Sequence, residues 1–312
     1  MSALPLIDFD VEKALTEARA FYGVFLQENI VSEDGVIAAR TPEWAAKMLR
    51  KQNIVDAVME KIGSNAFMKR RPQDKTDYRL YVQNAFTQNK PLLFRIPIGP
   101  VKNMNICGAN QRPDMAEYFM FIQLARFAAA IAALYPFGVK IQLVPDDVRA
   151  TYANLCPQDY VQSYVGGLRT LVEILGFAQW LQVENGQMRL CDMYRAHLHL
   201  QEAEEKLTLL KNTDPISFDA KWQAALENAR KNFVVNNSDN AEQEIAAAAW
   251  RYMVAHLSEI LSGMWSPRDA FPLVYANHAG NYQLFTMGAG RTRLPWQIAL
   301  PANIDENLRN IA

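Results

Sequence analysis

The chain has 312 residues, of which 50% are hydrophobic and 21% are charged, and its formal net charge is −1. This length suits one large domain or two closely packed ones, and such a chain can bury a core without cross-links. The balance of 32 basic and 33 acidic residues lacks the basic excess that nucleic acids and anionic membranes select, so neither partner is expected.

Cysteine usage and hydropathy indicate a cytoplasmic protein. Cys107, Cys156 and Cys191 are odd in number and well separated, which argues against a disulfide framework and suits a reducing compartment. The N-terminal residues carry acids and lack the basic and apolar runs of a secretion signal. The most apolar segment, MFIQLARFAAAIAALYPFGV, contains Gln123 and Arg126, so it is predicted as a core helix rather than a membrane span.

The first ninety residues are predicted to be a helical N-terminal region. Residues 8–28 have apolar positions at helical spacing, and residues 41–63 open with Thr-Pro-Glu, a typical helix start. The charged segment 69–79 interrupts this pattern, and a further short helix is predicted for 77–88.

From about residue 90 the pattern changes to short β-rich runs. LLFRIPI (92–98) and VKIQLVP (139–145) are predicted strands separated by a long helix over 114–134. A strand, a helix and a strand at this spacing form a βαβ unit, with parallel strands and a right-handed crossover. A helix over 157–175 follows, and the Asn-Gly pair in WLQVENGQMRL suggests a hairpin.

The last third adds helices and then closing strands. Residues 191–262 are predicted to be mostly helical, with breaks near 212–215 and 235–239. FPLVYAN (271–277), NYQLFTM (281–287) and PWQIAL (295–300) are predicted as three short strands. The chain therefore belongs to the α/β class, with a helical N-terminal layer over 1–90 and an α/β domain over 91–312 that includes the helical segment 191–262.

The loop 99–113 leaves the end of one strand and leads into a helix at Asp114. In an open α/β sheet, ligands bind beyond the carboxyl ends of the strands. A helix N-terminus near Arg95, Lys102 and Arg112 would suit a phosphate or a carboxylate. The loop matches neither GxxxxGK[ST] nor GxGxxG, so no nucleotide fingerprint is present. A ligand-holding loop and an ordinary connection both fit this composition.

Two pairs of acids lie near predicted strand ends. Asp114 and Glu117 share a helix face. The alternatives are a cap with a first-turn acid, or one of the two acids meeting a substrate amine at the sheet edge. Asp146 and Asp147 follow the second strand at the matching carboxyl end, where the alternatives are a turn and a catalytic role.

The histidines give no metal-site signal. His197 and His199 lie two apart on a predicted helix and do not face one another, and no HExxH is present. His256 is expected to be a partly buried helix residue. His278 differs, because it lies between two short strands, where loops usually carry function.

The glycine-rich C-terminal segment GAGRTRLPWQIAL contains a second candidate anion site. Arg291 and Arg293 alternate on one side beside glycine backbone and suit a phosphate, with a solvated basic hairpin as the alternative. No GxSxG, readable serine triad or activated-cysteine motif is present.

Four stretches, taken in this order and spacing, resemble the isocyanide (isonitrile) synthase family, also called the pyoverdine/dityrosine biosynthesis family. They are FRIPIGPVKNMNICGANQRPDMAEYF, ALYPFGVKIQLVPDD, QDYVQSYVGGLRTLVEIL and PLVYANHAGNYQLFTMGAGRTRLPWQIAL. The resemblance runs over about two-thirds of the chain, from the strand at residue 92 to PWQIAL.

The resemblance implies a Rossmann-like, mostly parallel sheet flanked by helices, without a metal or nucleotide cofactor. It implies an enzyme of secondary metabolism that joins the amine of tyrosine or tryptophan to ribulose 5-phosphate. The sugar supplies one carbon and the amine becomes an isonitrile. Because an imine must form, a general base is needed near the amine and general acids near the sugar. Lysine and arginine would hold the phosphate. The partners are thus two small molecules, and a homodimer is left open.

Five residues match the family by position, namely Lys102, Asp114, Asp146, His278 and Trp296. Three departures stand beside them. Lys102 is followed by Asn-Met-Asn rather than Ser-Pro-Asn, and the second strand ends in Pro-Asp-Asp rather than Ser-Asp-Gly. Gln297 stands where the family usually has a histidine, and glutamine cannot exchange a proton near neutral pH.

The predicted catalytic residues are Asp114, Asp146, His278 and Gln297. The predicted substrate-binding residues are Arg95, Lys102, Asn105, Glu117, Arg291, Arg293 and Trp296. Two hypotheses follow, an isonitrile-synthase-like enzyme or a divergent relative with a different amine-modifying step or a purely binding role. Retention of Lys102, Asp114 and His278 favours the first, and Gln297 favours the second.

Overall fold

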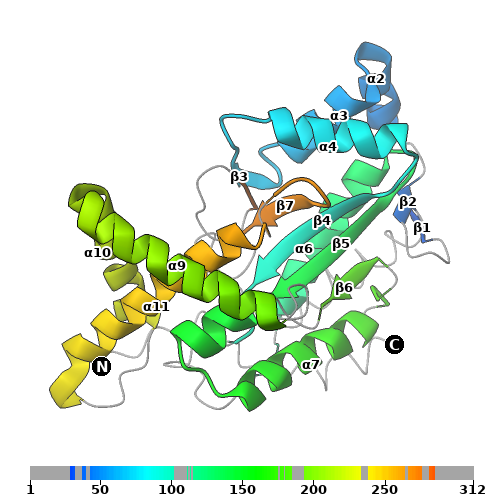
Figure 1. The fold of residues 1–312 in the computed structure, drawn as a ribbon. Coiled ribbons are helices and arrows are strands. Elements are labelled where there is room, and N and C mark those ends of the chain that lie inside the picture. Colours follow the sequence, from blue (N-terminus) through cyan, green and yellow to red (C-terminus); the bar gives the residue numbers. More distant parts are fainter. Residues whose placement is uncertain are drawn as a thin grey trace.

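The computed structural model describes residues 29–31, 37–39, 43–101, 111, 113, 115–174, 176–178, 180–184, 193–232, 238–263, 266–275 and 281–284. These residues form an α/β fold in which helices flank a mostly parallel sheet (Figure 1). None of the described helices is long and apolar enough to cross a lipid bilayer.

The sheet has the strand order β1-β2-β5-β4-β7-β8-β3, with β6 also beside β5. The strands are β1 (Asn29–Val31), β2 (Ile37–Ala39), β3 (Met68–Arg70), β4 (Leu92–Ile98), β5 (Val139–Pro145), β6 (Leu181–Val183), β7 (Phe271–Val274) and β8 (Tyr282–Leu284). The central pairs β4/β5, β4/β7, β5/β6 and β7/β8 are parallel, and β1, β2 and β3 pair antiparallel at the edges. The predicted fold class is confirmed.

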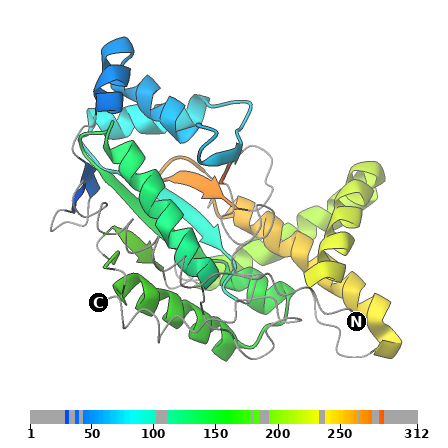
Figure 2. The same cartoon turned by 180° about the vertical axis from the view of Figure 1, so that it is seen from behind.

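Helices pack against the sheet and also lie at its two ends (Figure 1). They are α2 (Glu43–Lys51), α3 (Ile54–Ile62), α4 (Thr76–Thr87), α6 (Met115–Ala132), α7 (Gln158–Ile174), α9 (Met193–Thr213), α10 (Pro215–Asn232) and α11 (Ala241–Leu261). Two short turns, the π-helix η1 (Arg149–Ala153) and the 3-10 helix η2 (Ser238–Asn240), complete the described elements. Helices α2 to α4 lie at one end of the sheet, and α9 to α11 at the other (Figures 1 and 2).

The predicted βαβ unit is confirmed as β4, α6 and β5. The two strands pair in parallel from Leu92↔Val139 to Ile98↔Pro145. Alternate residues of β4 are fully buried, because the period of two places them on one face of the sheet. Helix α6 covers that face (Figure 2).

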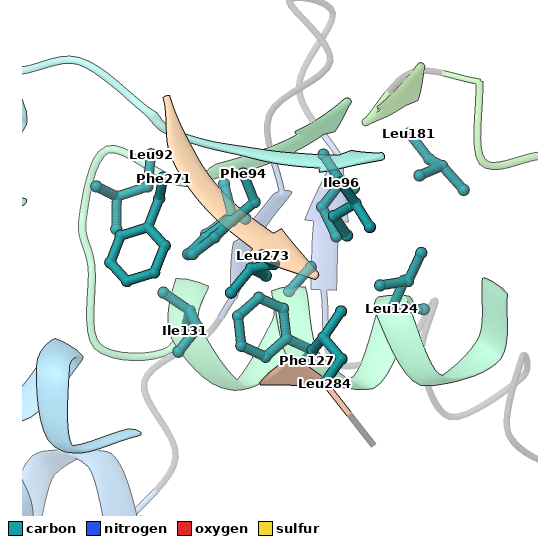
Figure 3. Close-up of a cluster of buried hydrophobic side chains, with 14 of the residues drawn as sticks. Leu92, Phe94, Ile96, Leu124, Phe127, Ile131, Leu181, Phe271, Leu273 and Leu284 are labelled. Atoms are coloured by element: carbon teal, nitrogen blue, oxygen red, sulfur yellow. The ribbon is translucent and has the colours of Figure 1, made fainter. Parts of the chain in front are cut away.

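An aromatic and aliphatic core fills the space between the sheet and α6 (Figure 3). The ring of Phe94 on β4 lies 4.9 Å from Phe127 of α6 and 5.3 Å from Phe271 of β7, measured between centroids. All three rings are almost completely buried, so this contact joins the βαβ unit to a strand from far along the chain. Burial of such rings contributes on the order of 2 kcal/mol each.

The first ninety residues contain the predicted helical layer and also three strands that the sequence did not predict. The single helix expected over 41–63 is two helices, because Asn53 begins a new one by accepting the backbone N–H of Asp56 at 2.9 Å. Each missed strand is three residues long. β1 pairs with the nearby β2, whereas β2 and β3 also pair with distant strands, through Ile37↔Val139 and Met68↔Leu284. The helix expected over 8–28 and the strand over 295–300 lie outside the described residues.

Helices α9, α10 and α11 form a bundle in which each helix packs against the other two. Its predicted breaks occur at Asp214 and at η2. The bundle docks on η1 through the buried, small Ala153 and through Tyr252 of α11. Because η1 directly follows β5, the bundle lies at the carboxyl edge of the parallel strands (Figure 1).

Candidate active site

Several buried polar side chains lie where the parallel strands end. Asp146 follows β5, and Glu117 lies in the first turn of α6, which begins at the same edge because it crosses back between two parallel strands. Asp146 is 6% exposed and Glu117 is fully buried. Buried carboxyl groups are rare unless they are paired, so their partners define the site.

The turn after β5 holds the Asp146 carboxyl in place. The Asp146 backbone N–H donates to the carbonyl of Ile98 at 2.8 Å, which ties the turn to the end of β4. Oδ1 of Asp146 accepts the backbone N–H of Arg149 at 3.1 Å, and Oδ2 lies 3.1 Å from Nε of the same arginine. The chain then continues as the π-helix η1, a geometry that often occurs at functional sites.

Arg149 connects this turn to the helical bundle. Its Nη2 donates to Oε1 of Glu259 on α11 at 2.6 Å, and the Glu259 side chain is 1% exposed. One guanidinium therefore bridges two buried carboxyl groups from segments 110 residues apart. Nδ1 of His256 lies 3.7 Å from Oε2 of Glu259, and the Tyr252 hydroxyl donates to Oδ1 of Asn154 beside η1.

The electrostatics of this cluster favour one retained proton. Burial raises the pKa of Asp146 to about 7, the nearby Glu259 adds to the rise, and Arg149 opposes it. Burial, together with the positive charge of Arg149, lowers the pKa of His256 to about 4, so this imidazole is neutral at pH 7. Two ionised carboxylates beside one guanidinium would leave one uncompensated negative charge. A proton on Asp146 removes that charge, and a group with this pKa can act as a general acid or base near neutrality.

A second buried pair of polar side chains joins α6 to α7. The Tyr164 hydroxyl of α7 donates to Oε1 of Glu117 at 2.8 Å, and both side chains are fully buried. The two helices approach closely because Gly167 has no side chain, since a Cβ there would lie 2.5 Å from Cδ of Pro113. This approach brings Tyr164, one turn before Gly167, against the start of α6.

Arg95 lies in the middle of β4 rather than at its end. Its Nε donates to Oε1 of Gln142 at 2.9 Å, and Nε2 of Gln142 donates to Oε1 of Glu184 at 2.8 Å. This row of polar side chains crosses β4 and β5 and ends just after β6. Its role in substrate binding stays a prediction.

The remaining predicted residues lie outside the described part of the chain. They are Asp114, His278 and Gln297 among the catalytic set, and Lys102, Asn105, Arg291, Arg293 and Trp296 among the binding set. His256 is half-buried on α11, as predicted. Among the described residues, no group of three His, Cys, Asp or Glu side chains could hold a metal ion.

Sequence reasoning missed Arg149, Tyr164 and Glu259. Arg149 had a usable signal in the sequence, because a cation three residues after an acid at a strand end can form an ion pair with that acid. Glu259 had none, because it reaches the site from 110 residues further along the chain, inside an ordinary amphipathic helix. Tyr164 likewise meets Glu117 only through the packing of two helices.

Comparison with known proteins identifies the family. The sequence profile of the pyoverdine/dityrosine biosynthesis proteins matches residues 82–251, which is more than half of the chain. The chain belongs to this family. The matched range contains β4, α6, β5, η1 and Asp146, and it ends within α11, before Glu259. The resemblance stated from the sequence is thereby confirmed.

A solved structure shares the fold of this family member. The crystal structure of the PvcA protein from Pseudomonas aeruginosa superposes with a TM-score of 0.61, over 78% of this chain and 88% of that one. The two sequences are 16% identical, so the likeness concerns the fold. No curated protein matches the chain in sequence.

Proposed function

We propose that this chain is an isonitrile-synthase-like enzyme of secondary metabolism. It would convert the amine of an amino acid of the tyrosine or tryptophan class to an isonitrile, with ribulose 5-phosphate as the carbon donor. Membership of a biosynthetic family supports the general role. The observation that carries the chemistry is the buried Asp146 carboxyl at the carboxyl edge of the sheet, with a pKa raised to about 7.

Imine formation explains why such a carboxyl is useful. The amine must lose a proton before it attacks the ketone of the sugar, and the carbinol oxygen must gain a proton before it leaves as water. We assign the first transfer to Asp146. A carboxyl that titrates near neutrality can take up this proton and release it in the same cycle, whereas one of ordinary pKa is a weaker base.

The other predicted residues complete the proposal. Lys102, Arg291 and Arg293 would hold the phosphate as charge-assisted hydrogen-bond donors. Asp114 would act at the substrate amine, and His278 would serve the sugar end as an acid.

A second candidate function rests on Gln297. If the histidine that usually stands there transfers a proton in the family, glutamine cannot replace it in that role. The chain would then carry out a different amine-modifying step, or bind the small molecules without turnover.

Mass spectrometry of the purified protein with ribulose 5-phosphate and the twenty amino acids tests the first candidate. The expected product is heavier than one amino acid by one carbon and lighter by two hydrogens, which also names the amine. Asp146→Asn and Lys102→Ala should each abolish this product. Asp214→Asn is the matched control, because Asp214 accepts the N–H of Ser217 at 3.1 Å as Asp146 accepts that of Arg149, but it lies on the surface.

Each result has a definite meaning. If no such product forms and ribulose 5-phosphate is not consumed, the second candidate replaces the first. If the product forms but persists in Asp146→Asn, the role assigned to Asp146 is wrong.

A further inference from the structure

Glu259 is an unusual residue for an otherwise ordinary helix. Its side chain is 1% exposed, although it lies on α11, a helix of the bundle rather than one that packs on the sheet. Oε1 accepts from Arg149 at 2.6 Å, whereas the buried Oε2 has no hydrogen-bond donor among the described residues. A buried carboxylate oxygen without a donor is destabilising, so its position in the fold calls for an explanation.

We propose that Glu259 is a positioning residue for Asp146, and that it acts through the Arg149 guanidinium. By this bridge the bundle α9–α11 fixes the orientation of the Asp146 carboxyl and holds a second buried acid beside the same guanidinium. The bundle is therefore part of the reaction site and not only a cover for it. This inference rests on the proposed function for its catalytic meaning, but the contact and its effect on protonation can be tested without turnover.

The geometry restricts which groups can set the protonation of Asp146. Arg149 faces it from its own turn, and Tyr252, His256 and Glu259 face this cluster from α11. Burial raises the pKa of Tyr252 to about 12 and His256 is neutral, so neither carries charge at pH 7.

The more distant cations Arg251 of α11 and Lys221 of α10 act on Tyr252 and His256. Neither is among the causes that shift the pKa of Asp146. Glu259 and Arg149 are thus the two charges with direct influence, and they act in opposite directions.

The bridge explains why Glu259 influences Asp146. Both carboxyl groups lie against the same guanidinium, which carries a single positive charge. The negative charge of Glu259 therefore disfavours a second negative charge on Asp146 and adds to the rise of its pKa that burial causes.

The test follows the Asp146 carboxyl by carbon-13 NMR of aspartate-labelled protein, with the signal assigned by its loss in Asp146→Asn. Wild type should titrate near pH 7. Glu259→Gln keeps the shape and removes the charge, so the midpoint should fall by roughly one to two pH units. Arg149→Lys should move it upward, because a compact ammonium cannot bridge two carboxyl groups as a guanidinium does.

The matched control is Glu242→Gln on the same helix. Glu242 also pairs with an arginine, Arg230, at 3.0 Å. This pair lies on the surface, at the opposite end of α11 from Glu259. The Glu242→Gln variant should leave the titration of Asp146 unchanged. The proposal is overturned if Glu259→Gln leaves the midpoint in place, or if Glu242→Gln moves it equally. If Glu259→Gln does not fold, Arg149→Lys decides, and an unchanged or lowered midpoint then overturns the proposal.

Failure of the proposed function would look different. If the protein makes no isonitrile but the two midpoints move in opposite directions, the bridge stands and only the reaction is wrong. If the protein does make an isonitrile, the pH profile of kcat should move with the NMR midpoint in Glu259→Gln. A profile that stays fixed while the midpoint moves would show that Asp146 is not the group that limits turnover.

Discussion

Asp146→Asn is expected to stabilise the protein above pH 7 and to leave its stability almost unchanged in acid. Folding raises the pKa of Asp146 from 3.8 to about 7, because burial and the charge of Glu259 disfavour the ionised form. Between these two values the folded protein binds a proton that the unfolded chain has released. The free energy of unfolding therefore falls as the pH rises through this window.

The magnitude follows from the width of the window. About three pH units at about 1.4 kcal/mol each amount to a loss of about 4 kcal/mol in the free energy of unfolding. This loss is complete above pH 7. Asparagine is uncharged at every pH, and its side-chain oxygen can still accept the N–H of Arg149. The variant thus resembles the protonated acid, and it avoids the cost that the wild type carries at high pH.

Urea unfolding of both proteins at pH 5, 6, 7 and 8 measures this effect. The free energy of unfolding of the variant, minus that of the wild type, should rise by about 3 kcal/mol between pH 5 and pH 8. About two of the three pH units fall in this range. His256 has a lowered pKa, so it destabilises the fold as the pH falls below its ordinary value of 6.5. Since both proteins contain His256, taking the difference between them removes most of its contribution.

Asp214→Asn again provides the control. Asp214 caps α10 at the surface, and its hydrogen bonds to Ser217 lower its pKa rather than raise it. Its substitution should give no gain at high pH. A difference between Asp146→Asn and wild type that does not change with pH, or that favours the wild type at pH 8, would refute the electrostatic account of the site.

Two further predictions concern the packing that supports the site. Gly167→Ala should cost about 1–3 kcal/mol in urea unfolding, because its Cβ would lie 2.5 Å from Cδ of Pro113. Gly166→Ala, which meets nothing within 4 Å on the same helix, should instead be neutral or stabilising by up to about 1 kcal/mol, and equal effects would contradict the argument. Tyr164→Phe should cost about 1.5–3 kcal/mol, because the buried Glu117 loses a hydroxyl donor at 2.8 Å, and stability equal to wild type would show that this bond contributes nothing.

Local sequence patterns were sufficient to predict the elements that do not depend on distant contacts. The two short β-rich runs LLFRIPI and VKIQLVP and the long helix between them predicted the βαβ unit, because composition and length are local properties of the sequence. Parallel pairing in turn puts Asp146 at the carboxyl edge of the sheet, because the carboxyl ends of parallel strands lie at the same edge and Asp146 directly follows β5. The four matching stretches also identified the family.

Tertiary structure alone decided the partners of Asp146. Arg149 and Glu259 meet because a three-helix bundle folds back onto the turn after β5, and no periodicity in the sequence records that contact. The short strands β2 and β3 share this property, because their long-range pairing partners, β5 and β8, lie far along the chain. A pKa is likewise a property of burial and of neighbouring charges, so the sequence could name the Asp146 carboxyl but could not predict that it keeps its proton near neutral pH.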